Sequence, residues 1–438
     1  MRNSAQLMST TLLALALTTP NLACVAEQNT WHPVKVEIVK QETGYQFLRG
    51  GKPYRIRGAG INHTDLETFA ANGGNSFRTW AVDDGALPAQ ELLDRAQALG
   101  LTVSLGLEFA SERHGYDYDD SSFVAKQFEE TRQRVLKYRD HPALLSWFIG
   151  NELNFDFNNA KVYTAVNDVS KMIHELDPNH PTTTTLSQFN KELVDTVQKH
   201  APDLDFLSFQ LYGDLINMPK YIEETKFTDP YFVTEWGAIG HWEVANTTWG
   251  APVEQTSTEK AASYANSYRK VLEPFPEQAL GNYVFLWGQK QERTATWYGM
   301  FLDSGEATET VDVMYQIWNG HWPENRTPQI SRLKLNGRFG KDSVIVESGK
   351  TYDAAVNITE LDDDPVTYRW EVLRESSATE VGGDVEYVPE QLENLIANSN
   401  RAEIEMKAPP EQGAYRLFVY AYDGKGHAAH ANIPFFVQ

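Results

Sequence analysis

Two buried-strand patterns, each ending in a glutamate, constrain this chain more than any other feature. Leu144–Ile149 is apolar except for Ser146, which favours a strand covered on both faces, as in a parallel sheet. Glu152 follows that run, and Glu235 directly follows the similar run Tyr231–Thr234. A single glutamate in such a place most often caps a helix or pairs in a loop. Because two of them stand at strand ends, the sequence predicts an active site.

Strand and helix patterns alternate over most of the chain, which is typical of βαβ units and a parallel sheet. We predict strands at residues 54–63, 75–80, 101–109, 144–149, 182–187, 206–211, 231–236 and 282–287, and helices at 89–99, 123–138, 162–176, 260–272 and 311–318. Eight strands with interleaved helices close into a (β/α)8 TIM barrel, where catalytic residues lie at the C-terminal strand ends. An alternating segment at 34–51 predicts a hairpin that plugs the bottom of the barrel.

The pattern changes to period two beyond Pro323 and Pro328, with predicted strands at 341–347, 367–373, 402–406, 415–422 and 430–437. Short strands with turns between them predict a small C-terminal immunoglobulin-like β-sandwich. The expected domains are therefore a signal peptide at 1–26, the α/β barrel with its hairpin at 27–325 and the accessory sandwich at 326–438. The acidic run 360–364 offers calcium ligands, but a solvated loop is the favoured interpretation.

The N-terminus carries Arg2, a short apolar run and then small residues, which is typical of a secretory signal and too short for a membrane span. Cys24 is the only cysteine, so the mature fold contains no internal disulfide, and this residue is a candidate lipid anchor. We expect an exported protein: periplasmic, an outer-membrane lipoprotein or secreted.

The net charge of −22 and the pI near 4.9 argue against nucleic acid and anionic membrane surfaces as partners, because both require basic patches. A neutral substrate fits this charge better than a polyanion. We find no His-x-His or paired His/Asp arrangement at the strand ends, which argues against a metal-dependent hydrolase. No metal and no cofactor are expected.

The motifs at 147–152 (WFIGNE) and 233–237 (VTEWG) resemble the two catalytic signatures of clan A glycoside hydrolases. The segments 55–58 (RIRG) and 75–80 (NSFRTW) add similarity to the barrels of family 2 and of the fungal β-1,3-glucanosyltransferases, where Trp80 stands in place of the usual Tyr. This resemblance implies Glu152 as acid/base and Glu235 as nucleophile. It further implies a retaining β-glycoside hydrolase that acts through a glycosyl-enzyme, with a neutral β-glucan as the favoured substrate.

Retaining hydrolysis needs one protonated and one ionised carboxyl group about 5 to 5.5 Å apart. We expect Arg78 and Tyr212 to donate hydrogen bonds that keep Glu235 ionised, and Asn151 to bond the sugar 2-hydroxyl. The resemblance implies Trp287 as a sugar platform. Alternatives are an ion pair inside the barrel for Arg78 and core packing for Tyr212 and Trp287. Further candidates for substrate contact are Trp80, His63, Glu108 and Trp236.

Three functional alternatives stay open. A transglycosylase differs from a hydrolase only in whether a sugar or water enters the acceptor site. Another β-linked glycan, such as mannan or galactan, can replace glucan as the substrate. A carbohydrate-binding barrel without activity is the non-enzyme alternative, and the presence of both Glu152 and Glu235 argues against it.

Overall fold

The computed structural model describes residues 31–61, 65–83, 87–274, 277–380 and 382–438. The signal peptide predicted at 1–26, the candidate lipid anchor Cys24 and the candidate site residue His63 lie outside the described residues. His32–Gln438 form one compact unit.

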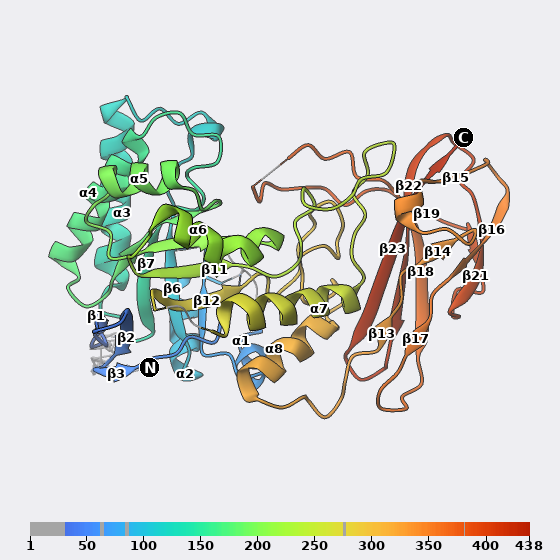
Figure 1. Ribbon diagram of the computed structural model, residues 1–438, viewed down its shortest axis with the longest axis horizontal. Coiled ribbons are helices and arrows are strands. Elements are labelled where there is room, and N and C mark those ends of the chain that lie inside the picture. Colours follow the sequence, from blue (N-terminus) through green and yellow to red (C-terminus); the bar gives the residue numbers. More distant parts are fainter. Residues whose placement is uncertain (1–30, 62–64, 84–86, 275–276, 381) are drawn as a thin grey trace, which may run out of the picture. The chain divides into compact units, whose positions relative to one another are not determined.

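A parallel sheet within this unit curls into a barrel (Figure 1). Its strands are β4 (Gly58–Gly60), β5 (Ser76–Arg78), β6 (Thr102–Leu107), β7 (Leu144–Ile149), β8 (Thr182–Thr183), β9 (Thr185–Leu186), β10 (Leu207–Gln210), β11 (Tyr231–Glu235) and β12 (Ala279–Val284). β8 pairs with β7 and β9 pairs with β10, and only Thr184 separates them. The two short strands are halves of the predicted fifth strand, so the sheet closes at this point and the predicted parallel barrel is confirmed.

Within the described residues a helix follows each barrel strand in turn: α1 (Leu66–Ala71), α2 (Ala89–Ala98), α3 (Ser121–Tyr138), α4 (Lys161–Leu176), α5 (Lys191–His200), α6 (Met218–Thr225), α7 (Ser257–Ser267) and α8 (Glu309–Asn319). Side chains cap several of them. Asp120 accepts from two backbone N–H groups at the start of α3, and Thr256 and Glu259 form a capping box on α7. None of the helices described is both long and apolar enough to cross a membrane.

β7 shows how the sequence places its strands in the barrel. All six of its residues are buried, and the five apolar ones are divided between two cores. Leu144, Trp147 and Ile149 pack in the layer between the sheet and the helices, whereas Leu145 and Phe148 pack inside the barrel. This two-sided burial is why the strand reads as a continuous apolar run.

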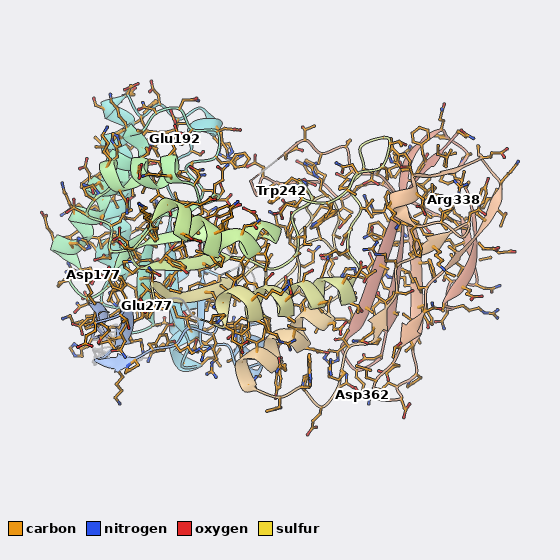
Figure 2. All side chains as sticks on the ribbon, in the orientation of Figure 1. Asp177, Glu192, Trp242, Glu277, Arg338 and Asp362 are labelled. Carbon is orange, nitrogen blue, oxygen red and sulfur yellow. The ribbon has the colours of Figure 1, made fainter. Side chains whose placement is uncertain are left out.

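The N-terminal hairpin of β1 (Val36–Lys40) and β2 (Tyr45–Arg49) closes the lower end of the barrel. Its Phe47 packs against Phe232 with ring centroids 5.5 Å apart. The hairpin also bonds to the loops that precede β8 and β12, since the Tyr45 N–H donates to the Glu277 carbonyl at 2.9 Å. Figure 2 labels Glu277 beside this hairpin. The predicted plug is confirmed, and the opposite end of the barrel remains for a site.

The C-terminal residues form three antiparallel or mixed sheets. A small sheet pairs β13 (Gln329–Ile330) with β17 (Ile358–Thr359); a second has the order β14 (Lys334–Leu335), β16 (Thr351–Ala355), β21 (Glu403–Lys407), β20 (Ile396–Ala397); the third has β15 (Val344–Val346), β23 (Ala428–Val437), β22 (Gly413–Tyr422), β18 (Thr367–Arg374), β19 (Gln391–Leu392). One hydrophobic core joins them, with Trp370 and Leu417 from the third sheet and Met406 from the second. All five predicted strands are present here; the immunoglobulin-like topology stays a prediction.

Buried polar groups connect these sheets to the barrel. The Arg416 guanidinium on β22 donates to the Pro252 carbonyl at 2.8 Å and to Glu375 at 2.8 Å. Asn432 on β23 donates at 2.6 Å to Glu254, whose carboxylate also pairs with the buried Lys260 of α7. Removing one partner from such a buried set leaves an uncompensated charge, so these contacts hold the C-terminal sheets against the α7 side of the barrel.

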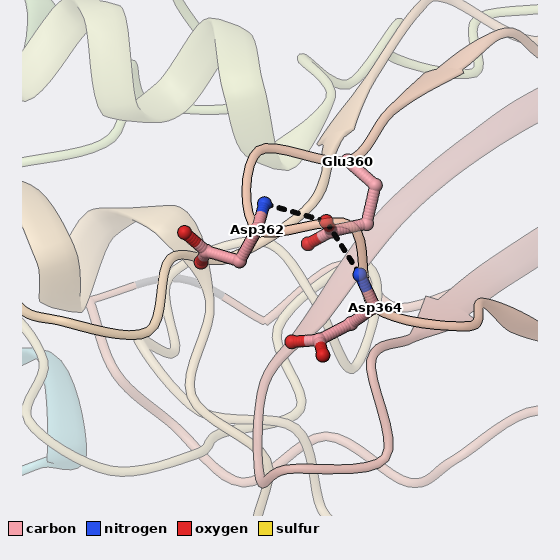
Figure 3. A group of neighbouring side chains, drawn as sticks. All are labelled: Glu360, Asp362 and Asp364. Atoms are coloured by element: carbon pink, nitrogen blue, oxygen red, sulfur yellow. Dashed lines mark hydrogen bonds between the residues drawn. The ribbon is translucent and has the colours of Figure 1, made fainter.

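The acidic run lies in the turn between β17 and β18, and Figure 3 shows its three carboxylates together. The Glu360 carboxylate accepts the backbone N–H groups of Asp362 and Asp364 at 2.7 and 3.0 Å. Lys425 pairs with Asp364 at 2.7 Å. These bonds stabilise the turn from within the chain.

Candidate active site

A cavity of about 1300 Å³ opens at the C-terminal ends of the barrel strands. Predicted site residues that line it are Trp80, Glu108, Asn151, Glu152, Tyr212 and Glu235. They come from five different strand ends, which is how a barrel of this type assembles a site. The structure therefore brings both predicted catalytic carboxyl groups to one cavity.

The turn after β7 gives Glu152 its position. Gly150 has φ +73°, and a Cβ there would meet the Leu153 side chain at 2.6 Å, so only glycine fits. Glu152 itself has φ +48°, a left-handed conformation that costs a non-glycine residue about 1 kcal/mol or more. Its N–H donates to the carbonyl and hydroxyl oxygens of Thr185, each at 3.1 Å, which holds the strained turn against β9.

The Glu152 carboxyl group has an environment that favours its protonated form. Among the residues that the structure describes, no side chain or backbone group donates a hydrogen bond to it. Burial, and after it the negative charge of Glu235, raises the pKa of Glu152 to about 8 against the opposing charge of Arg78. The group is therefore protonated at neutral pH and is able to donate that proton to a bound molecule.

Glu235, at the end of β11, has the opposite environment. Its side chain is 5% exposed and accepts hydrogen bonds from four donors. Arg78, the Trp80 indole and the Gln210 amide donate to Oε1 at 3.2, 2.8 and 2.9 Å, and the Tyr212 hydroxyl donates to Oε2 at 2.7 Å. In all four bonds the carboxyl oxygens accept, as those of an ionised carboxylate do.

The groups around Glu235 are themselves fixed. The Arg78 guanidinium lies over the rings of Trp80 and Phe148, at 4.8 and 5.3 Å from their centroids. Burial and the neighbouring Glu235 raise the pKa of Tyr212 well above its ordinary value, so its hydroxyl remains a donor across the working pH range.

The side chain of Asn151 is oriented by the same donors. Arg78, Thr185 and Gln210 donate to its Oδ1 at 2.9, 3.0 and 2.9 Å. Because this oxygen is satisfied, the amide NH₂ is the group that remains to bond a molecule in the cavity. Such a donor beside both carboxyl groups suits a sugar hydroxyl.

Two predicted tryptophans do not line the cavity, which corrects their expected positions. Trp287 is 3% exposed and packs against Phe69 and Phe301 at 5.2 and 5.1 Å. The reason is that β12 ends at Val284, earlier than predicted, so Phe285 lines the cavity instead. Trp236 is buried and donates to Asn282 at 3.1 Å, because strand alternation points it outward when Glu235 points inward.

Glu108 and Trp242 lie at the rim of the cavity. Glu108 is half exposed and pairs with Arg134, so the charge expected to face substrate is partly neutralised. Trp242, labelled in Figure 2, is 60% exposed and lies edge-on to Tyr212 with centroids 5.6 Å apart. Because Trp242 lines the cavity, the long loop after β11 contributes to the site.

Sequence reasoning missed several residues that organise the site. Gln210 bridges Asn151 and Glu235, and its place at the end of the sixth barrel strand was the available signal. Glu243 accepts the N–H groups of Gly213, Asp214 and Gly240 at 2.8, 2.7 and 2.7 Å, and so fixes the loop that carries Tyr212. Nothing in the local sequence distinguishes Glu243 from other loop glutamates.

A cluster of charged residues lies near Glu152, and two of its members, Lys290 and Glu292, act electrostatically on that carboxyl group. Lys290 pairs with Glu292 at 2.6 Å, and His241 lies 3.6 Å from the same carboxylate. Although burial by itself raises the pKa of Glu292, the His241 hydrogen bond and the Lys290 charge lower it overall. Lys290 and Glu292 follow β12 and His241 follows β11, in segments that carried no sequence motif.

Comparison with known proteins gives one family. The profile described as "Glycosyl hydrolases family 2, TIM barrel domain" matches residues 89–320, more than half of the chain. A search of curated protein sequences found no match.

Solved structures share the fold at low sequence identity. A putative β-galactosidase from Bacteroides fragilis superposes with a TM-score of 0.50 and 12% identity over 92% of this chain and 57% of that chain. A β-D-glucuronidase from Dictyoglomus thermophilum has a TM-score of 0.50 and 17% identity over 67% and 55%. A Bifidobacterium dentium β-glucuronidase gives 0.50 and 17% over 66% and 49%. This chain thus spans about half the length of these three structures.

Proposed function

Because the chain belongs to the glycosyl hydrolases of family 2 through its TIM barrel domain, we propose that it is a retaining β-glycosidase of the clan A type. The observation that carries the proposal is the contrast between the two carboxyl groups in the cavity. Glu152 is held protonated, with a pKa of about 8, whereas Glu235 accepts four hydrogen bonds. Double displacement requires one protonated and one ionised carboxyl group.

In the first step Glu235 attacks the anomeric carbon of the sugar. As the bond from its oxygen to that carbon forms, the glycosidic bond breaks and Glu152 transfers its proton to the departing oxygen. The donors on Glu235 position its carboxylate, and the Asn151 amide donates to the sugar 2-hydroxyl. That last bond strengthens as positive charge develops on the ring.

In the second step Glu152 acts as a base. The ester on Glu235 is neutral, so the repulsion that contributes to the raised pKa of Glu152 is gone. Glu152, now ionised, accepts a proton from water, and the oxygen attacks the anomeric carbon and releases Glu235. Two inversions restore the original configuration. When a sugar hydroxyl replaces water, the same step is transglycosylation.

The cavity supports a neutral glycan of several sugar units as the substrate. Its volume of about 1300 Å³ exceeds the roughly 300–1,000 Å³ of ordinary small-molecule sites. Arg113 and Lys290 line it, but each pairs with a carboxylate, at 2.7 and 2.6 Å. Aromatic rings that a sugar can contact are also present: Phe109, Tyr116, Phe155, Phe189, Tyr221 and Trp242. We propose a β-glucan, on the resemblance of the two motifs.

The remaining parts of the proposal come from the sequence. An exported protein, whether periplasmic, lipid-anchored at Cys24 or secreted, would meet polysaccharide outside the cytoplasm. The C-terminal sheets would form an immunoglobulin-like accessory module.

A substrate panel tests the function. Aryl β-glucosides, β-mannosides and β-galactosides, together with laminarin and other soluble β-glucans, would be incubated with the enzyme while proton NMR follows the first product. We expect the β-anomer to appear first from a β-glucan, and we expect the Glu235→Gln variant to be inactive. An α-anomer as first product contradicts the retaining mechanism, and a preferred mannan or galactan changes the substrate assignment. Products longer than the substrate would show transglycosylation.

A further inference from the structure

A loop of the C-terminal sheets contributes to the wall of the catalytic cavity. It joins β18 to β19 and comprises residues 375–380 and 382–390 of the described chain; Figure 1 shows it as a long excursion from the five-stranded sheet. Its Gly382 and Gly383 line the cavity. Both have positive φ values, +62° and +88°, and the absence of side chains leaves their backbone open to the cavity.

The first attachment of this loop is an ion pair with the barrel. The Arg113 guanidinium, in the segment after β6, bonds both carboxylate oxygens of Asp384 at 2.7 and 2.9 Å. It also donates to the Gly382 carbonyl at 3.2 Å, and His114 lies 3.2 Å from Asp384. Bidentate pairing of this kind fixes geometry better than a single contact does.

The second attachment lies on the other side of the barrel mouth, after β12. The Arg293 backbone N–H donates to Glu386 at 2.7 Å, and its guanidinium donates to the carbonyls of Glu380, at 3.0 Å, and Ala378. The Glu386 side chain is only 1% exposed. A carboxylate so deeply buried depends on these partners, so the loop is held on both sides of its glycines.

The wall lies on the side of Glu152. The Arg113 guanidinium lies 5.6 Å from the ring centroid of Phe155, whose N–H donates to the Glu152 carbonyl at 2.9 Å. A Cβ on Gly383 would lie 3.5 Å from the Lys290 ammonium, whose charge also acts on Glu152. Tyr212, the donor to Oε2 of Glu235, belongs to a different loop.

We propose that the β18–β19 loop forms the wall of the subsites for the leaving group, where it binds the sugar units of a neutral β-linked glycan beyond the bond that is cleaved. This inference rests on the proposed glycosidase function, because Glu152 protonates the oxygen on that side. The Gly382 carbonyl already accepts from Arg113, so the N–H groups of both glycines and the Gly383 carbonyl are the groups offered to sugar hydroxyls. Asp384 and Glu386 act as positioning residues. The C-terminal sheets thereby determine how well long substrates bind.

The test compares a long substrate with one that has no sugar on the leaving-group side. The variants are Asp384→Asn, Glu386→Gln and the pair combined; Glu347→Gln, which removes the exposed Lys350 pair in the same sheets, is the control. With a β-gluco-oligosaccharide of six sugars, kcat/KM should fall about tenfold, mainly through KM, and with an aryl β-glucoside it should stay within about twofold. Hydrogen exchange of residues 375–390 should become faster only in the loop variants.

Each result decides the inference. If exchange shows that the loop is released but the ratio of the two kcat/KM values is unchanged, the loop does not form these subsites. Exchange that is unchanged in the double variant would equally overturn it, since the contacts would not position the loop. Asp384 is 33% exposed, so its variant should fold even if Glu386→Gln does not. A wild-type protein that cleaves no β-glycoside refutes the glycosidase function and the loop inference together, whereas an active one with unchanged ratios refutes the loop alone.

Discussion

Replacing Glu152 by Gln should stabilise the folded protein, and the gain should grow with pH. The pKa of Glu152 is about 8 in the fold and 4.5 in an unperturbed chain, because burial and then Glu235 oppose its ionisation. Between these values the folded state holds a proton that the unfolded state releases. Folding stability therefore decreases as pH rises from about 4.5 to about 8 and changes no further above that.

The size of the effect follows from the same pKa. At about 1.4 kcal/mol per pH unit, the interval from 4.5 to about 8 corresponds to about 5 kcal/mol at pH 8. Because the carboxyl group faces an open cavity, solvent screening reduces this, and we expect about 2 kcal/mol. Glutamine has nearly the same shape as glutamate and carries no charge, so the stability of the variant does not decrease with pH through this position. At pH 5 wild type and variant should differ by less than about 1 kcal/mol.

Urea unfolding at pH 5 and pH 8 measures the difference in the free energy of unfolding between wild type and Glu152→Gln. Glu108→Gln is the matched control, since Glu108 also follows a barrel strand but is half exposed. That control should change the free energy of unfolding by less than about 1 kcal/mol at either pH. An equal difference between wild type and Glu152→Gln at both pH values would refute the electrostatic account of Glu152.

Four further outcomes are expected. Above about pH 8 kcat/KM should fall as Glu152 loses its proton, and a dinitrophenyl glycoside, which needs no protonation, should show a weaker fall in a pH series. Glu152→Gln and Glu235→Gln should each abolish turnover of natural glycan with unchanged circular dichroism; activity like wild type in either would contradict the two-carboxylate mechanism. Tyr212→Phe should lower kcat about 10- to 100-fold in steady-state assays because it removes the donor to Oε2 of Glu235, and an unchanged kcat would exclude that role. Trp287→Ala should reduce the free energy of unfolding by about 3–5 kcal/mol in urea, whereas a raised KM without lost stability would restore it as a sugar platform.

Much of the barrel was predictable because its strands are buried on both faces. β7 has the same bounds in sequence and structure, since all of its residues are buried and the turn after it needs Gly150. The helices α1, α5 and α6 were not predicted. α1 and α6 have only 6 and 8 residues and bury few side chains, so their apolar periodicity is too brief to separate from loop. α5 has 10 residues, as many as the predicted α2, and was missed although its Leu193, Val194 and Val197 are buried.

The two carboxyl groups of the site were predictable because strand ends set their position. The orientation of the aromatic side chains was less predictable. Trp287 does not reach the cavity because β12 ends before it, and only the three-dimensional register shows that. Contacts between distant parts of the chain left no local signal. Arg113 and Asp384 are 271 residues apart, so no pattern in the sequence links them.

The most direct test of the proposed mechanism is to trap the glycosyl-enzyme. A 2-deoxy-2-fluoro aryl β-glycoside of the sugar that the panel identifies would slow both steps, and its good leaving group would let the first step proceed. Mass spectrometry of the digested protein should then locate one added fluoro-sugar on Glu235, with none in the Glu235→Gln variant. A label on Glu152, or steady inversion of configuration with no labelled residue, would contradict the assignment of Glu235 as nucleophile.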